Sequence, residues 1–149
     1  MELSGEAELP CAPQRLRALL LEGPGLARRL APDARLRLCG DGSYEGEIAL
    51  TTVPFARRHP VRVCVAERDG AVWLDVRGQG RSQGLAIEVH LWLSGTASPS
   101  RTRLRYRVRT ELGGLREALG KGGLQRRIGD LLTALRAELR ARPGATANP

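Results

Sequence analysis

The sequence predicts an α+β fold in which a seven-stranded antiparallel sheet wraps around a long C-terminal helix, with two short helices between strands 1 and 2. Three observations support this prediction. Segments that alternate apolar and polar residues recur through most of the chain, prolines and glycines separate them, and the C-terminal region carries an amphipathic stripe. Each strand has one apolar face, as in antiparallel sheets that are covered on one side only.

Length and composition predict a single domain. The chain has 149 residues, of which 42% are hydrophobic, and this is enough for one core. We assign residues 1–141 to this domain. Residues 142–149 are rich in Pro, Gly and Ala, and we expect them to form a flexible tail.

The N-terminal region predicts one strand and two helices. Glutamates alternate with apolar residues over Glu2–Leu9, which indicates a strand. A helix is expected over Pro13–Leu21, because proline suits the first helical turn and leucines recur at helical spacing. Gly23-Pro24-Gly25 breaks that helix, and a shorter helix is expected over Leu26–Leu30.

Six further strands follow, each with apolar residues at every second position. Their shared inward faces carry, strand by strand, Leu36 and Leu38; Tyr44, Gly46, Ile48 and Leu50; Val61, Val63 and Val65; Val72, Leu74 and Val76; Leu85, Ile87, Val89, Leu91 and Leu93; and Thr102, Leu104, Tyr106 and Val108.

The chain ends in a long amphipathic helix. Its stripe consists of apolar residues at steps of three or four: Leu124, Ile128, Leu131, Leu135 and Leu139, widened by Leu132. A separate helical piece is expected over Leu115–Leu119, between Gly113-Gly114 and the next glycines of the chain. The long helix is the natural cover for the apolar side of the sheet.

Charge patterning predicts part of the strand order. The seventh strand carries five arginines on one outward face: Arg101, Arg103, Arg105, Arg107 and Arg109. Such a row of cations requires compensating charge on neighbouring strands. Acidic residues are available on the outward faces of the first and sixth strands: Glu2, Glu6, Glu8 and Glu88. We therefore expect the seventh strand to lie between the first and the sixth.

The same reasoning predicts a register for the fifth and sixth strands. Residue numbers that sum to 165 would pair Trp73 with Trp92, Asp75 with His90, and Arg77 with Glu88. This places Trp73 and Trp92 together on the outward face, where they could anchor a protein partner or stack nucleotide bases. The other interpretation of this face is a solvated surface with weak cross-strand ion pairs.

Composition excludes several classes of protein. The chain has 24 Lys and Arg against 16 Asp and Glu, a formal charge of +8. Lys121 is the only lysine, however, so arginine fills the usual surface positions of lysine, and we expect no nucleic-acid partner. No stretch approaches the roughly 20 apolar residues of a membrane span, and the N-terminus lacks signal-peptide features. We expect a cytoplasmic protein without a stable membrane anchor; transient membrane contact and oligomeric state stay open.

Signals for catalysis are weak. Gly78-Gln79-Gly80 lies between two strands, so it indicates a hairpin turn and not a dinucleotide site, which requires a following helix. His59 is expected in a loop before Pro60 and His90 on the outward face, neither with a nearby Cys or Ser that would form a nucleophile pair. The three cysteines are widely spaced, which indicates reduced thiols and no metal site. We assign no catalytic residues, metal or cofactor.

Several motifs resemble the carbon monoxide dehydrogenase G-subunit family, within the helix-grip START-like (polyketide cyclase/dehydrase, SRPBCC) superfamily. The segment from Gly113 to Gly120 is similar to that family's turn into the last helix. Thr102, Leu104 and Tyr106 match its T-x-L-x-Y strand, and the Gly78–Gly84 segment matches its glycine-rich hairpin. The resemblance covers roughly residues 3–141. It implies a helix-grip fold, an apolar cavity and an accessory role toward molybdenum hydroxylases of the carbon monoxide dehydrogenase type.

The aliphatic inward faces, together with this resemblance, predict a cavity that binds a lipophilic small molecule such as a quinone or a lipid. Its mouth is expected near the second helix, the Gly78–Gly84 hairpin and the glycines at the start of the last helix. The expected lining residues are Leu26, Leu30, Tyr44, Ile48, Leu50, Val63, Leu74, Val76, Ile87, Val89, Leu104, Tyr106, Leu115, Leu119, Leu124, Ile128 and Leu132.

Two other functions stay open. One is a cyclase- or dehydrase-like enzyme that uses the same cavity, with Tyr44 or Tyr106 as proton donor. The other is a protein-interaction subunit that uses the Trp73/Trp92 sheet face. A solid core without a cavity is equally compatible with the pattern of inward residues.

Overall fold

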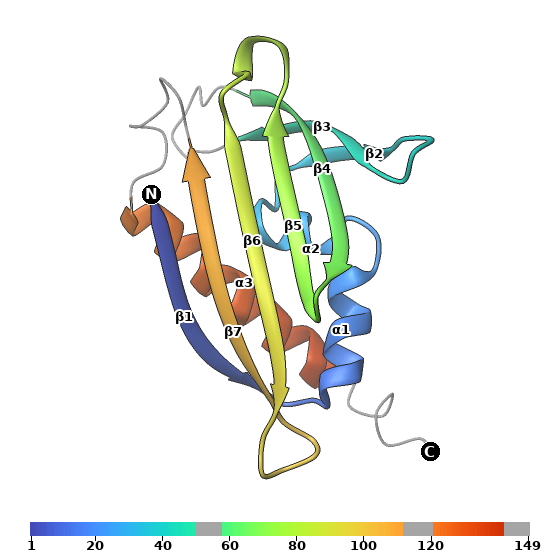
Figure 1. The fold of residues 1–149 in the computed structure, drawn as a ribbon, viewed down its shortest axis with the longest axis vertical. Coiled ribbons are helices and arrows are strands. Elements are labelled where there is room, and N and C mark those ends of the chain that lie inside the picture. The colour runs from blue at the N-terminus through green and yellow to red at the C-terminus, as the bar shows by residue number, and fades with distance from the viewer. Residues whose placement is uncertain (50–57, 112–120, 142–149) are drawn as a thin grey trace.

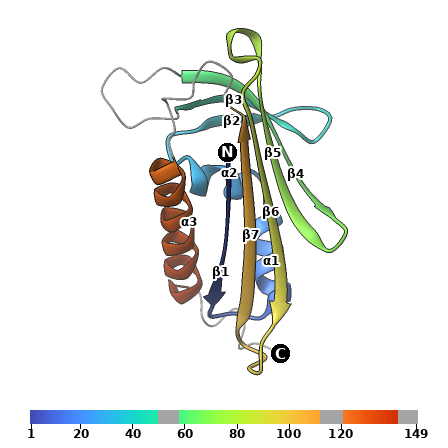
Figure 2. The same cartoon turned by 60° about the vertical axis from the view of Figure 1, so that its left-hand side comes forward.

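A computed structural model describes residues 1–49, 58–111 and 121–141, which form one antiparallel sheet with three α-helices on one of its faces (Figures 1 and 2). In chain order the elements are β1 (Glu2–Leu9), α1 (Pro13–Leu21), α2 (Gly25–Leu30), β2 (Arg35–Leu38), β3 (Tyr44–Ala49), β4 (Arg58–Arg68), β5 (Ala71–Gly78), the 3-10 turn η1 (Gly80–Ser82), β6 (Ala86–Gly95), β7 (Thr102–Glu111) and α3 (Lys121–Ala141). The predicted α+β class and element order are confirmed.

The seven strands follow the order β1-β7-β6-β5-β4-β3-β2, and all neighbours are antiparallel. The predicted place of β7 between β1 and β6 is therefore confirmed. Glutamates of β1 lie opposite arginines of β7, and Glu2 binds Arg107 at 2.7 Å. Both side chains are about half exposed, so this ion pair contributes only about 0–1 kcal/mol to the stability of the fold. Its main effect is to favour β1 as the neighbouring strand of β7.

The predicted register of β5 and β6 is wrong by two residues. Trp73 lies opposite His90, and Asp75 lies opposite Glu88. The connecting hairpin decides this register, because the Gly78 N–H donates to the Leu85 carbonyl at 2.8 Å and closes the loop around η1. A shift of two residues leaves every side chain on its own face, so alternation alone could not detect it.

The helix α3 packs its apolar stripe against the sheet, as Figure 2 shows. Its most buried side chains are those of the predicted stripe: Leu124, Ile128, Leu131, Leu135 and Leu139. Among the described residues of this helix, no large hydrophobic side chain is exposed to solvent. The helical piece predicted over Leu115–Leu119 and the predicted tail over residues 142–149 lie outside the described residues.

Proline and glycine mark where the two short helices that follow β1 begin and end. Pro13 occupies the first turn of α1, where its missing N–H leaves no hydrogen bond unmade. Gly23 then adopts a φ of +53°, a conformation that suits glycine, and the chain reverses into α2. Leu26 and Ala27 are buried, so α2 covers the interior at the end of the molecule where β2 and β3 lie (Figure 2).

Candidate functional site

A small apolar cavity lies in the interior, between the inner sheet face, α2 and α3. It has a volume of about 50 Å³. The described residues that line it are Ala27, Leu30 and Ala31 around α2; Ile48, Val63, Leu74, Val76, Ile87, Val89 and Val108 on the sheet; and Leu124, Arg127 and Ile128 on α3. Nearly all are aliphatic, so the cavity offers an apolar surface to an occupant.

Two periodicities place these side chains around one space. Where a strand contributes two lining residues, they are separated by two positions, as Leu74 and Val76 are on β5, so they share the inner face. On α2 and α3 they are separated by three or four positions, which places them on one helix face. The cavity is therefore bounded by the sheet on one side and by the two helices on the other.

Arg127 is the one charged residue in this described lining. Its Nη1 donates to the Leu30 carbonyl and its Nη2 to the Ala49 carbonyl, both at 3.0 Å. The guanidinium thus joins α3 to the last residue of α2 and to the last residue of β3. Sequence reasoning missed Arg127, because a single arginine beside an apolar helical stripe is typical of a solvated helix flank.

A second arginine holds α2 in place. Arg29 donates to both carboxylate oxygens of Glu138 on α3, at 2.7 to 3.0 Å. The pair is partly buried, with side-chain exposures of 15% for Arg29 and 29% for Glu138. A bidentate pair of this kind fixes orientation as well as distance. Two arginine contacts therefore close α2 over the cavity.

Many of the predicted lining residues surround this cavity, and others do not. The predicted residues that lie around it are Leu30, Ile48, Val63, Leu74, Val76, Ile87, Val89, Leu124 and Ile128. Leu26 and Leu104 are fully buried elsewhere in the core, and Leu132 packs against that core without lining the cavity. Leu50, Leu115 and Leu119 lie outside the described residues.

Tyr44 and Tyr106, two of the predicted lining residues, do not line the cavity. The Tyr106 hydroxyl lies over Gly5, its cross-strand partner on β1, and occupies the space a Cβ would need there. Tyr44 points its hydroxyl toward Gly23, 3.7 Å from the position of a Cβ on that glycine. Both glycines are far from these tyrosines in sequence, so local patterns could not indicate the contacts.

The expectation that His59 lies in a loop without a serine neighbour is wrong. His59 belongs to β4, and its Nδ1 lies 3.0 Å from the Ser82 hydroxyl, with both side chains buried. The pair ties the β5–β6 hairpin to β4, a role that the Arg81 bond to the Arg58 carbonyl shares. Within the described ranges, no three His, Cys, Asp or Glu side chains gather as metal ligands would.

Trp73 and Trp92 lie on the outer sheet face, as predicted, but they do not pair directly. The His90 ring stands between them, with centroids 3.7 Å from Trp73 and 5.9 Å from Trp92. Burial lowers the pKa of His90 below its usual value; Glu88 and Asp75 oppose this shift, and Arg107 and Arg109 add to it. The outer face therefore carries a compact aromatic cluster.

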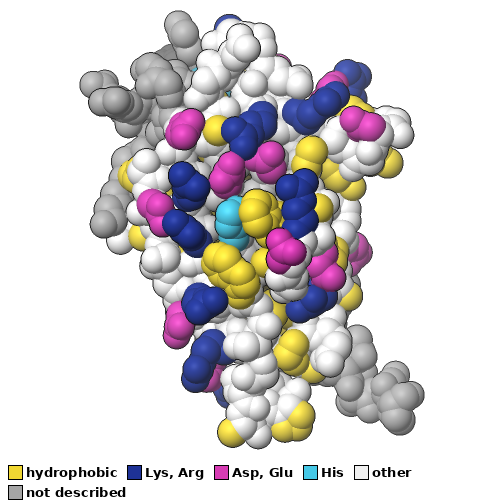
Figure 3. Space-filling model, viewed as in Figure 1, with side chains coloured by type: hydrophobic (Ala, Val, Ile, Leu, Met, Phe, Trp, Pro, Cys, Tyr) yellow, Lys and Arg dark blue, Asp and Glu magenta, His cyan; other side chains and the backbone are white. Residues whose placement is uncertain are grey.

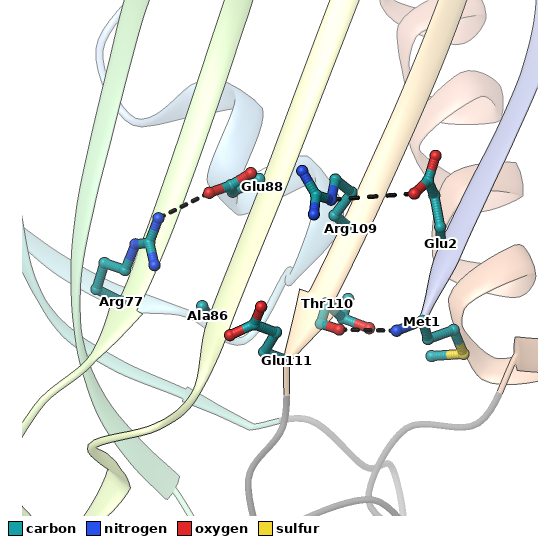
Figure 4. A pocket seen from close by; sticks show the side chains of 8 residues that line it. All are labelled: Met1, Glu2, Arg77, Ala86, Glu88, Arg109, Thr110 and Glu111. Atoms are coloured by element: carbon teal, nitrogen blue, oxygen red, sulfur yellow. Dashed lines mark hydrogen bonds and ion pairs between the residues drawn. The ribbon is translucent and has the colours of Figure 1, made fainter.

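The larger hollows of the described surface are lined by charged as well as apolar residues. One, of about 380 Å³, lies at the end of β1, β5, β6 and β7 (Figure 4). Its charged groups already satisfy one another, since Arg77 binds Glu88, Arg109 approaches Glu2, and the terminal amine donates to the Thr110 carbonyl. Another, of about 720 Å³, lies beside the edge strand β2. Neither matches the predicted apolar site.

None of the helices that the structure describes has the length and apolar character of a membrane span. No curated protein matches the chain. Solved structures do match over nearly the whole chain. A conserved protein from Geobacillus kaustophilus has a TM-score of 0.75 at 20% identity, covering 95% of this chain and 96% of that one.

Two other solved structures share the fold at lower identity. A protein from Thermus thermophilus has a TM-score of 0.66 at 16% identity, covering 95% of this chain and 98% of its own. A START superfamily protein from Mycobacterium smegmatis has a TM-score of 0.62 at 10% identity, covering 93% of this chain and 98% of its own. These likenesses establish the helix-grip, START-like fold.

A family profile decides the closer relationship. The profile of the carbon monoxide dehydrogenase G-subunit (CoxG) family matches residues 37–142, which is well over half of the chain. The matched region runs from β2 through α3 and includes most of the residues that line the cavity. The protein therefore belongs to the CoxG family of carbon monoxide dehydrogenase subunits.

Proposed function

We propose that this protein binds a lipophilic small molecule, of the quinone or lipid class, between α2, the inner sheet face and α3. The observation that carries the proposal is the lining of the interior cavity, which is aliphatic apart from Arg127. Ligand sites are commonly apolar with a few polar groups that orient the ligand. The sheet supplies a rigid wall, and α2 supplies a small movable one.

The cavity is smaller than its proposed occupant. Its volume is about 50 Å³, whereas typical ligand pockets have about 300–1,000 Å³. Loading therefore requires α2 to move away from α3. The helix is short, begins after the Gly23 turn, and packs mainly on α1 and α3 rather than on the sheet, so in this proposal it is the element that moves. In this proposal Arg29 and Arg127 hold the empty form closed.

The family supports a second part of the proposal, an accessory role to a carbon monoxide dehydrogenase or a related molybdenum hydroxylase. A lipophilic electron carrier held in an apolar cavity would suit a partner that oxidises its substrate. A binding assay with a purified carbon monoxide dehydrogenase as bait tests this link. Absence of binding with both the ligand-loaded and the empty protein would contradict it.

The cavity is tested by native mass spectrometry of delipidated protein incubated with decylubiquinone or palmitic acid. We expect a one-to-one adduct with at least one of them. Ala27 lines the cavity, so Ala27→Leu should remove most of the adduct by filling the space. Ala18→Leu is the matched control, because Ala18 is exposed on α1. A wild-type protein without any adduct, or equal adducts in both variants, would refute the site.

The alternative enzyme with a tyrosine proton donor receives little support from this geometry. Neither Tyr44 nor Tyr106 lines the cavity, and its described lining offers no carboxyl, imidazole or hydroxyl group for acid–base chemistry. Arg127 has its guanidinium engaged with two carbonyls. We therefore favour binding over catalysis for this interior.

A further inference from the structure

The outer face of the sheet carries a cluster that ligand binding in the interior does not use. It consists of Trp73, His90 and Trp92 with three surrounding arginines, Arg68, Arg103 and Arg105; we call this set the aromatic patch. Figure 3 shows apolar side chains and a histidine near the middle of this face, with both basic and acidic side chains around them. Tryptophan and arginine are the residues most enriched among the energetic centres of protein interfaces.

The side chains of the patch contact one another without any partner. The Trp73 and His90 rings stack at 3.7 Å, and the Trp92 ring meets His90 edge-on. The Arg68 guanidinium lies over Trp73 at 5.5 Å, and that of Arg105 over Trp92 at 5.2 Å. All of these residues stand on strands in the middle of the sheet. A preorganised surface loses less side-chain entropy on binding.

Charge on this face is unevenly compensated. Toward one end of the sheet the arginines bind carboxylates, as Arg77 does to Glu88 and Arg107 does to Glu2. In contrast, Arg68, Arg103 and Arg105 form no ion pair with any carboxylate of the described residues. The Trp73 and Trp92 rings are half-buried. Arg103 and Arg105 lie opposite Glu8 and Glu6 of β1 in the register but form no ion pair with them. The patch therefore combines partly exposed aromatic rings with unpaired arginines, which an acidic surface would complement.

The geometry disfavours two other occupants. Nucleotide bases need exposed ring faces on which to stack, but His90 and Arg68 cover the ring faces of Trp73, and Arg105 covers a face of Trp92. A second copy of this chain, joined about a two-fold axis through the patch, would bring its unpaired arginines against their own copies. Like charges in such contact oppose association.

We propose that the aromatic patch is a docking site for a protein partner that presents carboxylates around an apolar side chain. The apolar group would rest on the solvent-accessible parts of Trp73 and Trp92, which are both half-buried. The carboxylates would pair with Arg68, Arg103 and Arg105. This site lies on the face opposite the cavity, so it does not depend on the proposed ligand.

The test uses the full chain and a short synthetic peptide of alternating Glu and Leu, with a Gln-Leu peptide of equal length as its neutral counterpart. The chain has two tryptophans, and both belong to the patch, so intrinsic fluorescence reports binding there alone. Anisotropy of a labelled peptide provides an independent affinity. A single-stranded oligothymidylate is the competing nucleic-acid probe.

The variants separate the patch from general charge. Arg103→Gln with Arg105→Gln removes two unpaired arginines, and we expect at least about tenfold weaker binding of the acidic peptide. Arg101→Gln with Arg109→Gln removes the same charge from β7 and the residue just before it, but these arginines have carboxylates within ion-pair distance, Glu8 at 3.5 Å and Glu2 at 4.0 Å. This control should change the affinity less than about twofold.

Three results would overturn the proposal. The acidic peptide could bind no better than the neutral one, both variant pairs could weaken binding equally, or the oligothymidylate could bind more tightly than the acidic peptide. Trp92→Phe keeps an aromatic ring but reduces the contact surface. It should therefore weaken binding of the acidic peptide while the circular dichroism spectrum of the protein stays unchanged. Unaltered affinity in this variant would also contradict the proposed site.

Discussion

Replacing Arg127 by methionine tests how the cavity is closed. Arg127 donates to the carbonyls of Leu30 and Ala49 at 3.0 Å each. Methionine keeps an unbranched apolar stem against the cavity but has no donor, so the change removes both hydrogen bonds with little loss of packing. The Leu30 carbonyl belongs to the last turn of α2, where no intrahelical N–H is available to it.

The magnitude follows from these two bonds. A hydrogen bond with a charged donor contributes roughly 1.5–3 kcal/mol to stability. Because the Arg127 side chain is only partly buried, water can replace part of each interaction. We therefore expect Arg127→Met to lower the free energy of unfolding by about 2–4 kcal/mol.

Urea denaturation followed by tryptophan fluorescence measures this difference, since both tryptophans lie on the opposite sheet face and report global unfolding. Arg126→Met is the matched control: Arg126 is exposed on the same helix, and the change removes the same charge. The control should stay within about 0.5 kcal/mol of the wild type. Equal stability of the two variants would refute the role assigned to Arg127.

Three further predictions concern packing and pH. Gly46→Ala places a Cβ against the Arg35 carbonyl and Leu36 of β2, so it should destabilise the protein by about 1–3 kcal/mol, measured by thermal unfolding. The control is Gly40→Ala, whose Cβ meets open space and whose effect on stability should be close to zero. Leu135→Ala removes a fully buried side chain of α3 and should lower the urea-derived free energy of unfolding by about 2–5 kcal/mol; a loss below about 1 kcal/mol would contradict its place in the core. Burial lowers the pKa of His90 in the folded state, so the unfolded state binds its proton first, and the free energy of unfolding should fall as pH drops from about 6.5 toward that lowered pKa. His90→Phe should flatten the dependence over this window, and an unchanged slope would count against the assignment.

Local patterns predicted the elements and their faces with few errors. The bounds of β1 and α1 agree with those expected, because prolines and alternating glutamates mark them directly. Helical spacing likewise identified the buried stripe of α3. Even the place of β7 followed from the sequence, since its arginines require acidic neighbours on both sides.

The interior site was predicted less completely. The alternation of apolar and polar residues shows which side chains face inward. It does not show which of these side chains line the cavity and which pack in the solid part of the core. Leu104 and Val108 both face inward from β7, and only Val108 lines the cavity. Tyr106 packs over Gly5 and the Tyr44 hydroxyl lies near Gly23, so these orientations depend on glycines that are distant in the sequence.

By itself the sequence determined the fold class, the inward face of each strand and the helix that covers the sheet, because these depend on the spacing of apolar residues along short segments. Tertiary structure alone decided the β5–β6 register, the contact of His59 with Ser82, and the bonds of Arg127 to α2 and β3. A two-residue shift preserves both faces of a strand, and a hydrogen bond between distant elements leaves no periodic trace. These features depend on the conformation of the β5–β6 hairpin and on how α2 and α3 pack against the sheet.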